Sequence, residues 1–246
     1  MENAQLISLS RQVALQRQMD VVANNLANLN TTGFKGEKIL FEQYLMPVAQ
    51  DRDFTYPDQP LHYVQDWATV HDMANGPITL TGNPLDVALN GEGFLTVMTP
   101  AGERYTRNGS LQINSQGTLV DHEGNPVLAD GREVQFDESD IDISISPQGV
   151  ISTNNGLKGR LQVVEFASPE TLTREGDNLY AGGEAAQAAV NTRVTQGAVE
   201  RSNVSGVAQM TEMIRVSRAY ESLANTMQNQ DEMRRTAIQR LGDANA

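Results

Sequence analysis

Few side chains in this sequence carry the reactive or metal-binding chemistry that catalysis or ion binding requires. The 246 residues include no cysteine, which excludes disulfide bonds, cysteine-ligated zinc and thiol catalysis. The three histidines are His62, His71 and His122. No two of them are spaced as HxH or HxxxH, so the sequence does not predict a metal site built from histidine.

The densest group of carboxylates is formed by Asp137, Glu138, Asp140 and Asp142. Their oxygens could bind calcium, but the spacing lacks the EF-hand pattern, so we expect a solvated loop that leads into a strand. Residues 91–93 (Gly-Glu-Gly) lack the third glycine of a dinucleotide fingerprint, which favours a tight turn. No carboxylate pair is singled out by its spacing, and no Gly-x-Ser-x-Gly elbow is present. We therefore expect no metal, no cofactor, no catalytic residue and no enzymatic activity.

The formal net charge of −13 is confined to the middle of the chain. Residues 1–45 and 196–246 each contain as many basic as acidic side chains, so residues 46–195 carry the whole excess. Neutral ends can pack against other chains without self-repulsion, whereas an acidic middle stays solvated. The absence of a basic patch argues against nucleic-acid binding. No apolar run approaches the roughly 18 residues of a membrane span, and no cleavable secretory signal is predicted.

Hydrophobic periodicity predicts a helix at each end of the chain. The first covers residues 3–32, and the second covers residues 203–241. Each has an apolar stripe at heptad spacing, which a single helix cannot bury alone, so we expect the two helices to pair as a coiled coil in an assembly. Gly33 is the expected C′ residue of the first helix, and Phe34 is expected to make the apolar contact that accompanies such a cap. The two stripes consist of Leu15, Met19, Val22, Leu26 and Leu29, and of Met213, Val216, Tyr220, Leu223 and Met227.

The middle of the chain has the two-residue period of strands. Short apolar runs such as 94–99 and 160–166 alternate with turn signals rich in glycine, asparagine and proline. The predicted fold class is therefore α+β, with a mainly antiparallel β domain flanked by terminal helices. The expected divisions are an N-terminal assembly helix (1–35), an extended connector (36–75), the β-rich domain (76–195) and a C-terminal assembly helix (196–246).

Four sequence blocks, in order, resemble the flagellar rod and hook protein family. Residues 23–35 (ANNLANLNTTGFK) are similar to the N-terminal signature of that family, and residues 200–221 are similar to its closing motif. Between them, residues 81–94 together with 104–110, and residues 176–180, are similar to parts of its β domain. Within the family, the short chain and the compact segment before Thr81 favour the proximal rod type over the distal one.

The resemblance implies a structural subunit that polymerises through its terminal helices into the rod that spans the periplasm and transmits motor torque. It implies export through the flagellar type III apparatus, and it implies copies of this chain and other proximal and distal rod proteins as partners. Neither nucleic acid nor membrane insertion is implied. Besides the two stripes, the assembly residues that it implies are Asn24, Asn25, Asn28, Asn30, Thr32, Gly33, Phe34, Arg218 and Glu221.

The asparagines of the first block allow two interpretations. Asparagine is a mediocre helix former, so Asn24, Asn25 and Asn28 within two turns require a reason. Their amides could hydrogen-bond across packed helices and fix the register, or they could form a solvated face near a fraying helix end. Arg218 and Glu221 could likewise be plain surface charges, because exposed ion pairs contribute little.

Other classes of protein remain as alternatives. The chain could be a distal rod or hook-type paralogue, since these share the same blocks. It could also be a surface adhesin whose β domain binds a target, or a secreted enzyme that cleaves carbohydrate. For a rod subunit, the terminal helices should order only on assembly, because ordering a residue costs about 1–2 kcal/mol in backbone entropy.

Overall fold

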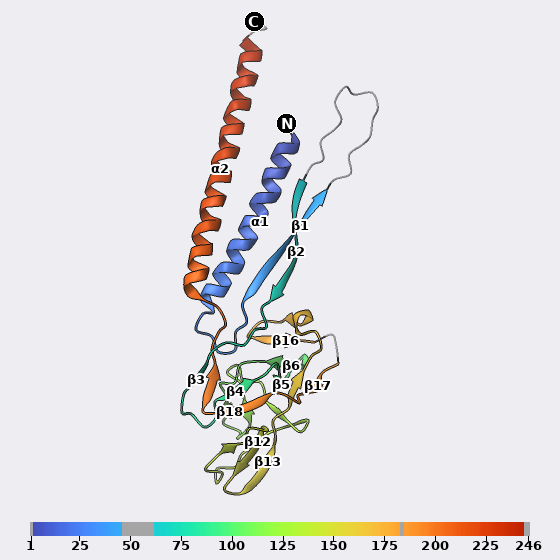
Figure 1. The fold of residues 1–246 in the computed structure, drawn as a ribbon, viewed down its shortest axis with the longest axis vertical. Coiled ribbons are helices and arrows are strands. Elements are labelled where there is room, and N and C mark those ends of the chain that lie inside the picture. Colours follow the sequence, from blue (N-terminus) through green and yellow to red (C-terminus); the bar gives the residue numbers. More distant parts are fainter. Residues whose placement is uncertain (1, 46–61, 183–184, 244–246) are drawn as a thin grey trace. The chain divides into compact units, whose positions relative to one another are not determined.

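A computed structural model of the protein describes residues 2–45, 62–182 and 185–243 (Figure 1). The chain folds as two compact units. The helical unit comprises Met1–Leu26, Glu37–Val70 and Gly206–Ala246, and the β unit comprises Ala27–Gly36 and His71–Ser205. The chain therefore passes between the units four times, and the segment that follows the first helix belongs to the β unit.

Two antiparallel helices form most of the helical unit, α1 (Glu2–Ala27) and α2 (Gly206–Asp243) (Figure 1). Gln12 Nε2 donates a hydrogen bond to the Tyr220 hydroxyl at 2.9 Å, and Gln18 Nε2 donates to Glu212 Oε1 at 2.7 Å. Along α1 from Gln12 to Gln18, the hydrogen-bond partner on α2 moves back from Tyr220 to Glu212, so the two helices are antiparallel. With 38 residues against 26, α2 is about 18 Å longer than α1, so its last turns extend beyond the start of α1.

The first helix ends five residues earlier than the sequence predicts. After Ala27 the chain turns, because the Thr31 N–H donates to the Asn28 carbonyl at 3.2 Å and the Thr31 hydroxyl donates to Asn28 Oδ1 at 3.1 Å. Asparagine and threonine side chains that bond to local groups offer the backbone an alternative to helix, which periodicity does not register. The prediction that Gly33 is the C′ residue of this helix is therefore wrong. The second helix begins three residues later than predicted, at Gly206.

The expected connector contains a two-stranded sheet, β1 (Glu37–Leu45) with β2 (His62–His71) (Figure 1). Residues 46–61 of that connector lie outside the described residues. The sequence did not predict the pairing, because no short turn signal joins two runs that far apart. Both strands are rich in aromatic and β-branched residues, which suit a pleated sheet.

The β unit is built from short antiparallel strands, in agreement with the predicted α+β class. Its largest sheet has the order β15-β16-β6-β5-β14-β17. The strands of that sheet are β5 (Phe94–Thr99), β6 (Gly102–Thr106), β14 (Val163–Glu165), β15 (Thr173–Arg174), β16 (Leu179–Ala181) and β17 (Gln187–Ala188). A three-stranded sheet contains β11 (Ser144–Ile145), β12 (Val150–Thr153) and β13 (Gly156–Arg160).

The remaining strands form two-stranded sheets that close the β unit. The pairs are β18 with β4, β19 with β3, β7 with β8 and β10 with β9. Their bounds are β3 (Ile78–Leu80), β4 (Val87–Asn90), β7 (Gln112–Ile113), β8 (Leu119–Val120), β9 (Leu128–Ala129), β10 (Arg132–Glu133), β18 (Arg193–Gln196) and β19 (Ala198–Glu200), and one 3-10 turn spans Pro169–Thr171.

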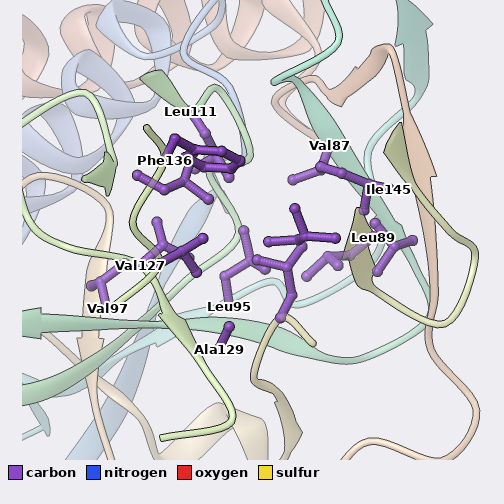
Figure 2. Packing of buried hydrophobic residues seen from close by; sticks show 14 of the residues in the cluster. Val87, Leu89, Leu95, Val97, Leu111, Val127, Ala129, Phe136 and Ile145 are labelled. Carbon is purple, nitrogen blue, oxygen red and sulfur yellow. The ribbon is translucent and has the colours of Figure 1, made fainter. Parts of the chain in front are cut away.

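Aliphatic side chains from many of these strands meet in one core (Figure 2). Leu95, Val97, Val127 and Ile151 are fully buried there. A second cluster contains three aromatic rings that pack edge to face, as Phe94 does with both Phe166 and Tyr180. Packing of this kind stabilises a β unit whose strands are individually too short to be stable.

Candidate assembly site

The predicted stripes lie on the faces that α1 and α2 turn toward their own unit. Val22 is 5% exposed and Val216 is fully buried, whereas the other stripe positions of both helices are half-buried. The half-buried members are Leu15, Met19, Leu26, Leu29, Met213, Tyr220, Leu223 and Met227, of which Leu29 lies beyond the end of α1 and in the β unit. Pairing of the two helices therefore covers these stripes only in part.

A second apolar stripe, missed by the sequence analysis, lies on the outer side of α2. Val207, Met210 and Ile214 are spaced 3 and 4 residues apart and are 79%, 55% and 54% exposed. On α1, Leu9 and Val13 are 51% and 58% exposed at a spacing of 4. Scattered exposed apolar residues are normal, but a helical stripe of them is typical of an unfilled packing face. The spacing of Val207, Met210 and Ile214 was visible in the sequence, but the stronger heptad stripe of α2 obscured it.

The conspicuous asparagines do not form one face. Asn25 is 2% exposed, and its side chain both accepts from the Glu37 N–H and donates to the Glu37 carbonyl, each at 2.8 Å. An amide presents a donor and an acceptor side by side, so it pairs with one strand residue as a neighbouring strand would. Neither interpretation holds for Asn25, because its side chain is buried and its partner is Glu37, the first residue of β1. Asn24 is exposed, and Asn28 holds the turn after α1.

Residues 30–32 bind the rest of the β unit by side chain. Asn30 Oδ1 accepts from Arg201 at 3.1 Å, and the Thr32 hydroxyl donates to Asn108 Oδ1 at 2.6 Å. The Thr32 carbonyl accepts from the Asn178 amide at 3.2 Å. Both predicted residues thus take part in the structure of the subunit itself. Arg218 and Glu221 are exposed on α2, where their role in assembly stays a prediction.

Gly33 sits where no other residue fits. Its φ is +67°, a left-handed conformation that L side chains rarely adopt. A Cβ at this position would lie 2.4 Å from the Arg107 carbonyl carbon and 2.5 Å from the Asn108 nitrogen. The Gly33 N–H meanwhile donates to the Glu200 carbonyl at 2.7 Å. The glycine is needed because this backbone passes directly against two others.

Phe34 anchors the same segment by burial. Its side chain is fully buried, and the Arg174 guanidinium lies 4.4 Å from the centre of its ring. The Phe34 carbonyl accepts from the Asn203 N–H at 3.4 Å. The predicted assembly residue is therefore part of the β unit core, and it holds the chain that precedes α2 as well as its own segment.

Three buried charges meet beside Phe34, and the sequence analysis did not select any of them. Lys35 Nζ donates to Glu200 Oε1 at 2.7 Å and to the Ala74 carbonyl at 2.8 Å. Arg107 Nη1 lies 3.4 Å from Glu200 Oε2, and its Nη2 donates to the Gly91 carbonyl at 2.8 Å. Lys35 is 0% exposed, Glu200 is 1% exposed and Arg107 is 3% exposed. The sequence could have indicated them, because all three lie inside the blocks that resemble the rod and hook protein family.

The electrostatics of this cluster follow from its burial. Burial lowers the pKa of Lys35 below its ordinary value, and the Glu200 carboxylate opposes that effect. Burial lowers the pKa of Arg107 in the same way. The charge of Arg107 is stabilised in part by the face of the Phe94 ring, whose centre lies 4.9 Å from the guanidinium carbon. Glu200 also accepts the Gly76 N–H at 2.8 Å, so its carboxylate serves partners from three separate segments.

The acidic cluster at residues 137–142 has a structural role. Asp140 accepts from Lys158 and from the Asp137 N–H, and these bonds hold the pKa of Asp140 well below its usual range. The chain then runs into β11, as predicted. Within residues 2–45, 62–182 and 185–243 there is no group of three side chains that could hold a metal ion. No helix in those ranges is long and apolar enough to cross a membrane.

Three family models match successive parts of the chain. One described as "Flagella basal body rod protein" matches residues 6–35, which cover most of α1 and continue to Lys35. One described as "Flagellar hook protein FlgE/F/G D1 domain" matches residues 88–153, within the β unit. One described as "Flagellar basal body rod FlgEFG protein C-terminal" matches residues 195–240, which include Glu200 and most of α2.

Curated relatives match over the whole chain. The flagellar basal-body rod protein FlgF of Caulobacter vibrioides is 38% identical over 248 residues, with 100% of both chains covered. FlgF of Mesorhizobium japonicum is 31% identical, with 98% of this chain and 99% of the relative covered. The chain therefore belongs to the flagellar basal-body rod protein family.

Within the family, the likeness is to FlgF. The flagellar basal-body rod protein FlgG of Buchnera aphidicola subsp. Acyrthosiphon pisum is 31% identical, with 89% of this chain and 92% of the relative covered. The two FlgF relatives cover at least 98% of this chain. The four sequence blocks predicted the family, and the short chain and compact segment before Thr81 predicted the proximal type. The resemblance to an FlgF-like rod protein is confirmed.

Proposed function

We propose that this protein is a structural subunit of the proximal part of the bacterial flagellar rod, and that it polymerises through α1 and α2. It is a rod protein of the basal body and not an enzyme, as its family relationship indicates. The observation that supports polymerisation is the exposed stripe of Val207, Met210 and Ile214 on a helix whose opposite face is already paired. Such a helix can pack on two sides at once.

A helix with two apolar faces suits an open helical array. Each subunit would use one face of α2 for its own α1 and the other for a neighbour, so that the two surfaces in contact differ. Heterologous contacts of this kind continue indefinitely unless the rotation closes a ring. The neighbours proposed are copies of this chain and other rod proteins, and the resulting coiled-coil layer would transmit torque. Export through the flagellar type III apparatus is part of the same proposal.

Assembly and folding of the helices are proposed to be coupled. In the free subunit the stripes of α1 and α2 are covered only in part, while ordering each residue costs about 1–2 kcal/mol in backbone entropy. Helices that become fully ordered only among neighbours would delay polymerisation until the subunits reach the growing tip.

The substitution Val216→Asp tests whether the helices assemble. Val216 is the fully buried stripe residue of α2, so the change places an unpaired carboxylate between the helices. An uncompensated buried charge costs about 3–5 kcal/mol, which lowers the pairing equilibrium by a hundredfold or more. We expect cells that carry only this variant not to swim and their basal bodies to lack the protein.

The matched control is Ser222→Asp. It adds the same charge to the same helix at an exposed position, on the side of α2 away from both apolar stripes. Swimming should stay near the wild-type level, and circular dichroism should show an intact β unit in both variants. Normal swimming of the Val216→Asp cells would contradict assembly through this helix pair.

A further inference from the structure

The segments by which the chain passes between the two units are bound to one another inside the β unit. On the β-unit side, the passages are flanked by residues 27–36, by the segment that begins at His71, and by the segment that ends at Ser205. Hydrogen bonds join all three. The Asp72 N–H donates to the Gly36 carbonyl at 2.7 Å, and the Gly36 N–H donates to Asn203 Oδ1 at 2.8 Å. Asn203 Nδ2 donates back to the Asp72 carbonyl at 2.7 Å.

The buried charges tie the same three segments together. Lys35 comes from the first segment, Glu200 from the third, and Glu200 accepts the Gly76 N–H of the second. Arg107, which follows β6, attaches this group to the main sheet through Glu200 and through the Gly91 carbonyl. Every passage of the chain is thus fastened at one buried point that contains none of the residues of α1 or α2.

We propose that Lys35, Glu200 and Arg107 form a clamp that folds with the β unit in the free subunit, before α1 and α2 assemble. The part of the subunit that folds only on assembly then includes α1, which ends before Asn28, and α2, which begins at Gly206. In the assembled rod, the force that the covalent chain carries between the helical layer and the β units passes along these segments, and the clamp fastens them to the β unit. This role in the rod rests on the proposed function, whereas the early folding of the clamp does not.

A buried ion pair contributes little net stability, because the desolvation of its charges offsets their attraction. Removal of one partner leaves a buried charge without compensation. Loss of any one of the three side chains should therefore release all three segments together. A lysine that only covered apolar surface would give the opposite result, because a methionine could replace it without loss. The two roles therefore differ in how substitutions combine.

Hydrogen exchange of the free, full-length protein tests the proposal directly. We expect the Gly33, Gly36, Asp72 and Asn203 amides to be protected as strongly as those of β5 and β6. In Glu200→Gln they should exchange at least about a hundredfold faster, because breaking a buried ion pair opens the region that it holds. Equal protection in wild type and variant, or wild-type protection no greater than that of α1, would overturn the proposal.

A double-mutant cycle keeps the test informative if a variant unfolds locally. Lys35→Met, Glu200→Gln and the combined variant are compared by exchange at the Gly33 and Asn203 amides. If the pair is one clamp, the combined variant loses little more protection than either single change, whereas independent residues would give losses that multiply. Multiplied losses would overturn the proposal.

Glu175→Gln is the matched control for the same measurement. Its carboxylate pairs with Arg104 at 2.6 Å and is 46% exposed, so its loss should leave the four amides unchanged. The outcome also separates the two proposals. If the clamp amides are protected in the free protein but the protein does not enter the rod in cells, only the proposed function is refuted. If those amides are unprotected although the cells swim, only this inference is refuted.

Discussion

Gly33→Ala is expected to destabilise the β unit strongly and to abolish swimming. The alanine would have to hold φ near +67°, at a cost of about 1–2 kcal/mol, and its Cβ would press on backbone atoms of Arg107 and Asn108. Overpacking typically costs about 1–3 kcal/mol, and here the obstacle is backbone that cannot swing away, so the total is about 2–5 kcal/mol. Urea unfolding of the purified protein, followed by far-ultraviolet circular dichroism, measures the change.

Gly124→Ala is the appropriate control. Gly124 also has a positive φ, +91°, but a Cβ there would meet no atom within 4 Å. This variant should lose only the conformational part, about 1–2 kcal/mol, and should swim. Similar losses for both glycines would show that close approach to Arg107 has no energetic consequence.

Phe34→Ala is expected to cost about 3–5 kcal/mol of unfolding free energy, as is usual for the loss of a fully buried phenylalanine. The ring also lies against Arg174, so the guanidinium loses a partner at 4.4 Å. Thermal and urea unfolding should both report the loss, and basal bodies from cells with this variant should contain less of the protein.

Two further variants test the contribution of the buried Phe34 ring. Leu157→Ala removes an apolar side chain that is 71% exposed, so it should change the unfolding free energy by less than about 0.5 kcal/mol. Phe34→Leu keeps most of the buried volume without the aromatic face, and an intermediate loss is expected. A Phe34→Ala protein as stable as wild type would show that this segment is not held by the β unit in solution.

The N-terminal signature has a different role from the one that its asparagines first suggest. Helical periodicity predicts a helix that continues to residue 32, yet the structure assigns residues 27–35 of this motif to the β unit. Asn25 binds Glu37, Thr32 binds Asn108, and Lys35 binds Glu200. The motif is therefore better described as the attachment of a helix to a β unit than as a helix-packing face.

Local patterns predicted the elements that are stabilised locally. The apolar stripe around Val22 and Val216 and the alternating runs of the β unit depend on periods of a few residues, which any stretch of sequence displays. The β1–β2 pairing was not predicted, since pairing across residues 46–61 leaves no mark on either strand. The end of α1 was missed because Asn28 and Thr31 form bonds that compete with the helix.

The sequence by itself determined the family, the α+β class and the helix–β–helix order, because motif blocks and periodicity are properties of neighbouring residues. Only the tertiary structure decided what Lys35, Arg107 and Glu200 do. Each is a charged residue of a type that normally stays at the surface, and 165 positions separate Lys35 from Glu200. Their burial arises where three distant segments meet, so it is a property of the fold and of no single stretch of chain.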